Sequence, residues 1–117
     1  TKMANQIAIA GVVSGVCEAI TYAKKAGLDV NTMLNSISKG AAGSWQMSNM
    51  GPKMINEDFA PGFYIKHFIK DMKIAVEECV EFNSELKVLN KVLEMYETLE
   101  LNDCGDFGTQ ALIKYYE

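Results

Sequence analysis

One long apolar stretch at the start of the chain constrains the fold most. Between Lys2 and Lys24 the only charged side chain is Glu18, and the stretch closes at Gly27, a residue type that commonly ends helices. A helix that is apolar nearly all round is normally buried by neighbours on every side. The sequence therefore predicts an all-α, compact multi-helix domain built around a long buried first helix.

The rest of the chain contains further helical patterns and no alternating strand pattern. Apolar residues at helical spacing predict helices at residues 30–39, 64–82, 85–101 and 107–116, with short helical turns at 45–50 and 52–56. Polar residues before four of these segments are expected to cap them, namely Asp29, Ser44, Ser84 and Asp106. Trp45, the only Trp, is expected to pack rather than to bind.

Charge and cysteine usage exclude several classes of function. The net charge is −4 and all 11 basic residues are Lys, so nucleic-acid binding has no electrostatic support and no guanidinium can clamp an anion. The 3 Cys are odd in number and fit neither a disulfide framework nor a metal site, which suits buried thiols in a reducing cytoplasm. His67 is the only His, so no metal site is expected.

The apolar run at residues 7–17 is too short to span a bilayer. No signal peptide is visible either, so no membrane partner is expected. Within this run, Gly11 and Gly15 form a Gly-x-x-x-Gly pair. Outside a membrane, such a pair indicates only that another helix can approach closely at that point.

A small polar cluster stands at the front of the first helix. Lys2, Asn5 and Gln6 are spaced i, i+3 and i+4, so their side chains project from one face of the first turns. One interpretation is an ordinary solvated surface, which the spacing alone favours. The other is a site in which an ammonium stands beside two amides at the mouth of the domain.

Motifs spread over the whole chain favour the second interpretation. Residues 2–6 read Lys-Met-Ala-Asn-Gln, residues 61–63 Pro-Gly-Phe, residues 70–71 Lys-Asp and residues 106–112 Asp-Phe-Gly-Thr-Gln-Ala-Leu. In this order and spacing the chain resembles the C-terminal domain of the β-hydroxyacid dehydrogenases. These include 3-hydroxyisobutyrate dehydrogenase, tartronate semialdehyde reductase and 6-phosphogluconate dehydrogenase. The resemblance implies a fold like the C-terminal domain of 6-phosphogluconate dehydrogenase.

The resemblance also implies an activity and roles for individual residues. It implies an oxidoreductase that uses NAD or NADP to interconvert a small 3-hydroxy acid and its semialdehyde. Lys2 matches the family's catalytic Lys, which gives or takes the proton at the substrate oxygen. Asn5 and Gln6 match amides that orient Lys2 or the substrate. Lys70 matches a cofactor-contacting Lys, Asp71 is expected to fix Lys70 or to cap locally, and Phe63 is expected to shape the cofactor side of the cleft.

The same resemblance implies a partner domain upstream. The family's dinucleotide-binding Rossmann domain carries a Gly-x-Gly-x-x-Gly turn, and residues 1–117 contain no such pattern. These residues are therefore expected to be a fragment: a helical substrate-binding and dimerisation domain that forms homo-oligomers and is inactive alone. Two alternatives stay open, namely a structural oligomerisation module with vestigial site residues and a stand-alone binding protein for a small carboxylate.

Overall fold

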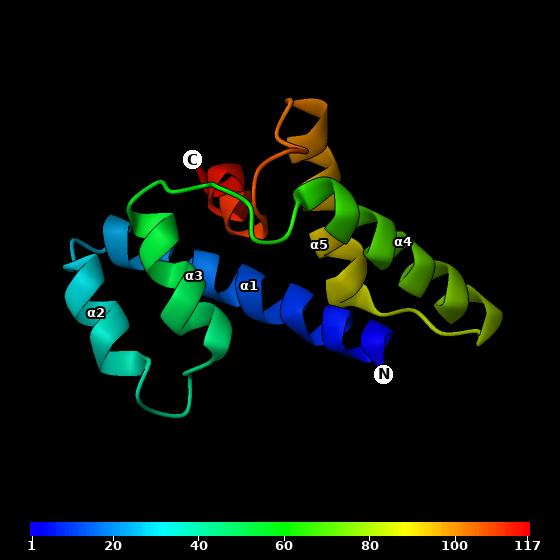
Figure 1. Cartoon of the computed structure of the whole chain (residues 1–117). Helices are drawn as coiled ribbons and strands as arrows, with labels where there is room; N and C mark the ends of the chain where they lie inside the picture. Colours follow the sequence, from blue (N-terminus) through cyan, green and yellow to red (C-terminus); the bar gives the residue numbers. More distant parts are fainter.

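The computed structural model describes residues 1–117 as five α-helices and one 3-10 helix (Figure 1). They are α1 (Lys2–Lys25), α2 (Val30–Ile37), α3 (Trp45–Ile55), α4 (Ile65–Glu81), α5 (Lys87–Leu101) and η1 (Thr109–Tyr116). An isolated bridge between Tyr64 and Gly108 is the single β-type pairing. The predicted all-α class is confirmed.

Helix α1 runs through the middle of the domain and contacts every other element (Figure 1). One of its faces joins the core through Gln6, Ala10, Val13, Ser14, Val16, Cys17, Ile20 and Ala23. The opposite face is open, because Val12 is 38% and Tyr22 is 69% exposed. The central position of the first helix is as predicted, but burial on every side is not, since the other elements pack on one face and leave a stripe uncovered.

Helix α1 as a whole is long and apolar enough to cross a membrane, by length and composition only. The shorter run at residues 7–17 is too short to do so. Core helices of folded domains meet the same criteria. Here the buried face of α1 packs in the same hydrophobic core as residues of α3, α4, α5 and η1.

The end of α1 is closed as the sequence predicts. Gly27 has a φ of 77°, a conformation that Gly adopts without steric cost. The N–H of Leu28 donates to the carbonyl of Ala23 at 2.9 Å, and the N–H of Gly27 donates to Lys24 at 3.3 Å. This pair of bonds is a Schellman motif, which satisfies carbonyls that the helix would otherwise leave free.

Two of the predicted caps are confirmed. The Asp29 carboxylate accepts from the N–H of Thr32 at 2.9 Å, and the Ser44 hydroxyl accepts from the N–H of Met47 at 3.0 Å. The two short turns expected after Ser44 are instead one helix, α3, with Pro52 inside it. Pro52 has no backbone N–H, so the carbonyl of Ser48, four residues earlier, lacks its helical donor. Ser48 and Pro52 both lie on the exposed side of α3.

The cap predicted at Ser84 is wrong. Asn83 has a φ of 55°, and the N–H of Ser84 donates to the carbonyl of Cys79 at 2.8 Å. Ser84 therefore closes the end of α4. Helix α5 starts at Lys87 with Leu86 as its N-cap and no side-chain cap.

The cap predicted at Asp106 is also wrong. Its carboxylate pairs with the Lys66 ammonium at 2.6 Å, and the last element is the 3-10 helix η1, without a side-chain cap. The segment before η1 instead provides hydrogen-bond acceptors for the start of α4. The N–H groups of Ile65 and Lys66 donate to the carbonyls of Phe107 and Gly105 at 2.9 and 3.0 Å, so tertiary contacts satisfy the free donors at the start of α4.

Close packing between α2 and α3 gives a test of the fold. A Cβ atom at Gly51 would lie 2.8 Å from Leu34 Cδ2, so Gly51→Ala forces the buried Leu34 side chain to shift. Ala gains about 1 kcal/mol of helix propensity over Gly, which offsets part of the packing cost. We therefore expect the free energy of unfolding to fall by about 1–2 kcal/mol, measured by urea denaturation. Ser48→Ala, on the exposed side of the same helix, is the matched control and should stay within about 0.5 kcal/mol. An equal effect of the two changes would contradict this packing.

Candidate functional site

A chain of polar contacts joins the start of α1 to the middle of α4. Asn5 Nδ2 donates to Gln6 Oε1 at 3.1 Å, and Gln6 Nε2 donates to Asp71 Oδ2 at 2.9 Å. The other carboxylate oxygen, Asp71 Oδ1, lies 3.8 Å from Lys2 Nζ. The structure therefore brings together the three residues that the sequence placed on one helix face, and adds a fourth.

Burial divides this cluster into a supported layer and an open layer. Gln6 and Asp71 are 8% and 9% exposed, whereas the Lys2 side chain is 72% exposed. A buried carboxylate is costly unless it is paired and hydrogen-bonded, and Asp71 has a partner on each oxygen. The result is a fixed anion beside an ammonium that remains open to solvent.

Asp71 is the residue whose role the sequence missed. Its expected role was to fix Lys70 or to cap locally, but its bonds go to Gln6 and Lys2 on α1. The only sequence signal was an acidic residue on the otherwise apolar face of α4. Periodicity puts that residue at a buried position, although it does not name the partner.

Lys70 and Phe63 are both exposed and stay outside this cluster. No hydrogen bond or ion pair joins either residue to Lys2. The Phe63 ring lies 6.3 Å from His67 and 6.0 Å from Phe68, between ring centroids. Lys70 directly precedes Asp71 on α4, but no ion pair or hydrogen bond joins its side chain to the cluster.

Trp45 does not pack as expected. It is 66% exposed and lines a hollow of about 330 Å³ together with Asn5, Ser44 and Gln46. The Oε1 atom of Gln46 is buried and has no hydrogen-bond partner. Asn5 belongs both to the lining of this hollow and to the polar cluster, and that proximity could not be seen from the sequence.

The buried Cys17 is not a nucleophile. Burial raises the pKa of its thiol well above the usual range, and the nearby Glu18 carboxylate adds to the effect. Its Sγ lies 3.8 Å from Met54 Sδ in the core. Since the thiolate is the reactive form, Cys17 serves the packing of the core rather than covalent chemistry.

Comparisons with known proteins agree with this architecture. A family model described as NAD-binding of NADP-dependent 3-hydroxyisobutyrate dehydrogenase matches residues 1–116. The oxidoreductase YkwC of Bacillus subtilis is 47% identical over 116 residues, which are 99% of this chain and 40% of that protein. The 2-hydroxy-3-oxopropionate reductase of Escherichia coli is 30% identical over 116 residues, again 99% of this chain and 40% of that protein.

A solved structure shows the same fold. The 3-hydroxyisobutyrate dehydrogenase of Salmonella typhimurium superposes with a TM-score of 0.88 at 24% sequence identity, over 97% of this chain and 40% of that one. The chain thus spans less than half the length of the relatives it matches.

The buried contact between Gln6 and Asp71 gives a test of the cluster. Gln6→Glu would set two carboxylates against each other, and we expect the free energy of unfolding at pH 7 to fall by about 1–3 kcal/mol. Protonation of either carboxyl removes the repulsion, so the loss should shrink as the pH falls to about 4. The double variant Gln6→Glu/Asp71→Asn keeps one charge and one amide and should recover most of the stability. A loss that does not change with pH would contradict the contact.

Proposed function

The chain belongs to the family of NAD(P)-dependent 3-hydroxyisobutyrate dehydrogenases, and from this premise we propose that it carries the catalytic Lys of such an oxidoreductase. The reaction interconverts a small 3-hydroxy acid and its semialdehyde. The observation that carries the proposal is the Lys2 ammonium, held 3.8 Å from the buried Asp71 carboxylate yet open to solvent.

Lys2 supplies the proton that this reaction needs. In the reducing direction the carbonyl carbon gains a hydride, and the carbonyl oxygen takes a proton from the Lys2 ammonium. In the oxidising direction the neutral Lys2 amine accepts the hydroxyl proton as the hydride leaves. A positioned acid or base of this kind contributes about 10²–10⁴-fold to the rate.

The other members of the cluster hold Lys2 in place. Asp71 gives the ammonium a fixed negative partner, and Gln6 occupies the second oxygen of that carboxylate. Asn5 donates to Gln6 and so fixes the orientation of its amide. Since Asn5 is exposed, its own carbonyl oxygen remains able to accept a hydrogen bond from the substrate hydroxyl.

Two exposed side chains fit a nicotinamide dinucleotide. The Lys70 ammonium can donate to a hydroxyl or phosphate oxygen as a point charge, and the Phe63 ring, 41% exposed, can cover an aromatic face. NAD or NADP, when bound, supplies or accepts the hydride. The other cofactor contacts are assigned to a Rossmann domain outside these residues, since residues 1–117 contain no Gly-x-Gly-x-x-Gly turn.

We assign the whole protein to the cytoplasm, as a homo-oligomer.

The role of Lys2 is tested in the intact protein that contains this chain. We expect Lys2→Ala to lower kcat for semialdehyde reduction by about 10²–10⁴-fold while the far-UV circular dichroism stays unchanged. The melting temperature should fall only slightly, because Asp71 loses the ammonium but keeps its bond to Gln6. Lys39→Ala removes another exposed ammonium and should leave kcat unchanged. Unchanged turnover of the Lys2→Ala protein would favour a structural module with vestigial site residues.

A second test concerns residues 1–117 expressed alone. We expect no measurable turnover of a semialdehyde with NADH or NADPH, because most cofactor contacts are assigned to the Rossmann domain. Titration of nucleotide fluorescence should likewise give no saturable binding. Turnover at a useful rate would contradict the assignment of most cofactor contacts to the Rossmann domain. Saturable binding of a small carboxylate without turnover would favour a stand-alone binding protein.

A further inference from the structure

The single imidazole of the chain has no role in the site described above. His67 is exposed on the first turn of α4, and no ion pair includes its side chain. No side-chain hydrogen bond includes it either, so both ring nitrogens are free to meet a ligand. In the neutral ring one nitrogen is a donor and the other an acceptor.

Two aromatic rings hold the His67 imidazole in a defined place. Its centroid lies 6.3 Å from that of Phe63 and 5.3 Å from that of Tyr64. Phe63 is itself fixed. Its ring packs edge-to-face with the buried Phe68 at 6.0 Å, and its carbonyl accepts from the N–H of Thr109 at 3.0 Å. A side chain that is already held in place loses less freedom when it binds a ligand.

His67 stands between the two residues proposed to contact the cofactor. Phe63 precedes it by four residues and Lys70 follows it by three, spacings that place side chains on one face of a helix. The Phe63 ring lies just before α4 and still meets His67 directly. All three side chains are exposed. We call these three residues the α4 stripe.

The α4 stripe is also where α4 offers a free positive charge. Lys66 is paired with Asp106 at 2.6 Å, and Lys73 is paired with Glu97 at 3.5 Å. Lys70 is the one Lys of α4 without a carboxylate partner. A free ammonium three residues from a free imidazole can meet neighbouring oxygens of one anionic group, because both present N–H donors on the same face.

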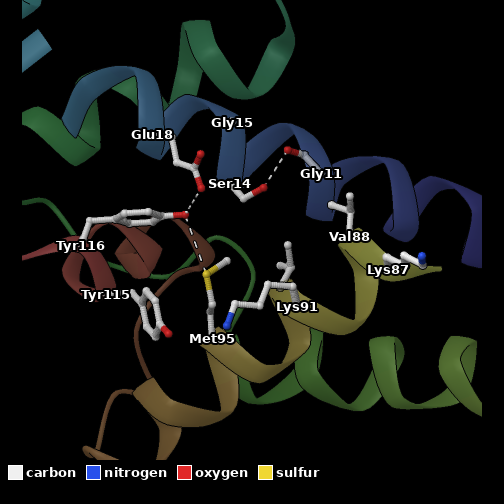
Figure 2. A pocket seen from close by; sticks show the side chains of 11 residues that line it. Gly11, Ser14, Gly15, Glu18, Lys87, Val88, Lys91, Met95, Tyr115 and Tyr116 are labelled. Atoms are coloured by element: carbon white, nitrogen blue, oxygen red, sulfur yellow. Dashed lines mark hydrogen bonds between the residues drawn. The ribbon is translucent and has the colours of Figure 1, made fainter. Parts of the chain in front are cut away.

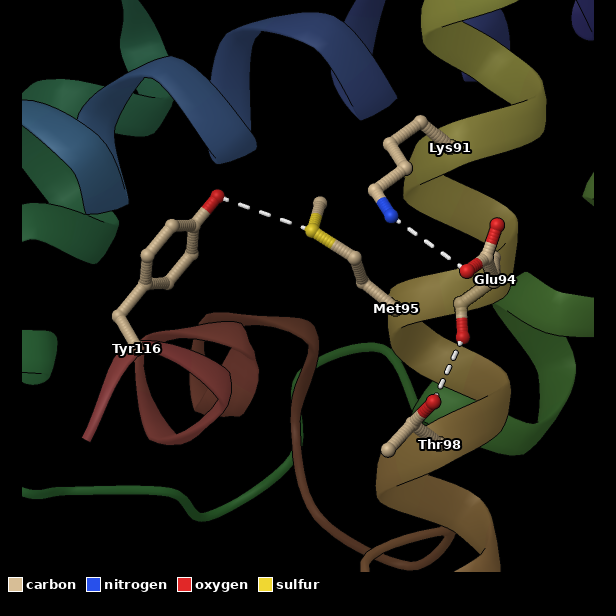
Figure 3. Close-up of polar contacts among 5 residues, drawn as sticks. All are labelled: Lys91, Glu94, Met95, Thr98 and Tyr116. Atoms are coloured by element: carbon tan, nitrogen blue, oxygen red, sulfur yellow. Dashed lines mark hydrogen bonds and ion pairs between the residues drawn. The ribbon is translucent and has the colours of Figure 1, made fainter.

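A larger hollow elsewhere fits an anionic cofactor less well. It measures about 540 Å³, lies between α1 and α5, and has Lys87 as its free ammonium. Figure 2 shows the Glu18 carboxylate in its wall, which accepts from the neutral Tyr116 hydroxyl at 2.8 Å and so keeps its negative charge. Lys91 in the same wall is already paired with Glu94 at 3.4 Å (Figure 3). A phosphate there would meet an unneutralised carboxylate, whereas the α4 stripe contains none.

We propose that His67 is a further cofactor-binding residue, whose imidazole N–H donates to the ribose-phosphate of the nicotinamide half of NAD or NADP. This inference rests on the proposed function, which assigns Lys70 and Phe63 to the cofactor. Lys70 directly precedes Asp71, which lies 3.8 Å from the Lys2 ammonium. The half of the cofactor that carries the hydride must lie near Lys2, so this half is the one that the α4 stripe meets. His67 binds and takes no part in the proton transfer.

The first experiment measures nucleotide binding and turnover in the intact protein that contains this chain. The dissociation constants of NADH and NADPH are obtained by titration of nucleotide fluorescence. We expect His67→Ala to raise the constant of the preferred nucleotide about three- to tenfold, the worth of one hydrogen bond, with kcat at saturating nucleotide unchanged. Lys73→Ala removes an ammonium that is already paired and should leave the constant unchanged. An unchanged constant for His67→Ala overturns the proposal.

Two further variants separate the hydrogen bond from the packing of the ring. His67→Gln keeps an N–H donor and loses the ring, so its dissociation constant should lie closer to that of the unmodified protein than the constant of His67→Ala does. His67→Phe keeps a ring against Phe63 and Tyr64 but has no donor, so it should bind as weakly as His67→Ala. The reverse order would show that the imidazole only packs, and would overturn the proposal.

The same measurements separate this inference from the proposed function. Saturable nucleotide binding by the unmodified protein and a large loss of turnover in Lys2→Ala, with unchanged His67 variants, would overturn the role of His67 alone. Failure of the intact protein to bind either nucleotide would overturn both.

Discussion

The buried carboxylate of Asp71 is the interaction on which the site depends. A charge below a tenth exposed is unstable without partners, so α1 and α4 must dock where Gln6 and Lys2 can reach both of its oxygens. The packing of α1 on α4 that gives Asp71 its partners also places the Lys2 ammonium 3.8 Å from the Asp71 carboxylate. The same two contacts therefore stabilise the buried charge and position the proposed proton donor.

A second set of contacts keeps α4 in that position. The first N–H groups of α4 donate to carbonyls of the segment 105–108, and Gln110 Nε2 donates to the carbonyls of Asp58 and Ala60 at 3.0 and 2.9 Å. The loop before α4 and the last segment of the chain are therefore tied to each other. The end of the sequence in this way helps to fix a site formed at its beginning.

Features that rest on contacts between residues close together in the sequence could be predicted, and features that rest on contacts between distant residues could not. The helices and the caps at Asp29 and Ser44 rest on contacts within a few residues, and periodicity and residue type predict them. The caps expected at Ser84 and Asp106 failed because other partners compete for these residues, namely the end of α4 and the Lys66 ammonium. The contact of Asp71 with Gln6 spans 65 residues, and no local pattern encodes it. Lys70 and Phe63 rest on the family resemblance alone.

The thiol of Cys17, in contact with Met54 in the core, can report how often the core opens. Cys17 Sγ and Met54 Sδ are 3.8 Å apart, and both residues lie fully inside the core that α1 and α3 share. A thiol reagent can reach Cys17 only when these helices separate, which requires the cooperative core to open. The rate at which Cys17 itself is labelled would then report the rarest fluctuations of the native state, while the labelling of the less buried Cys79 would report motions near the end of α4.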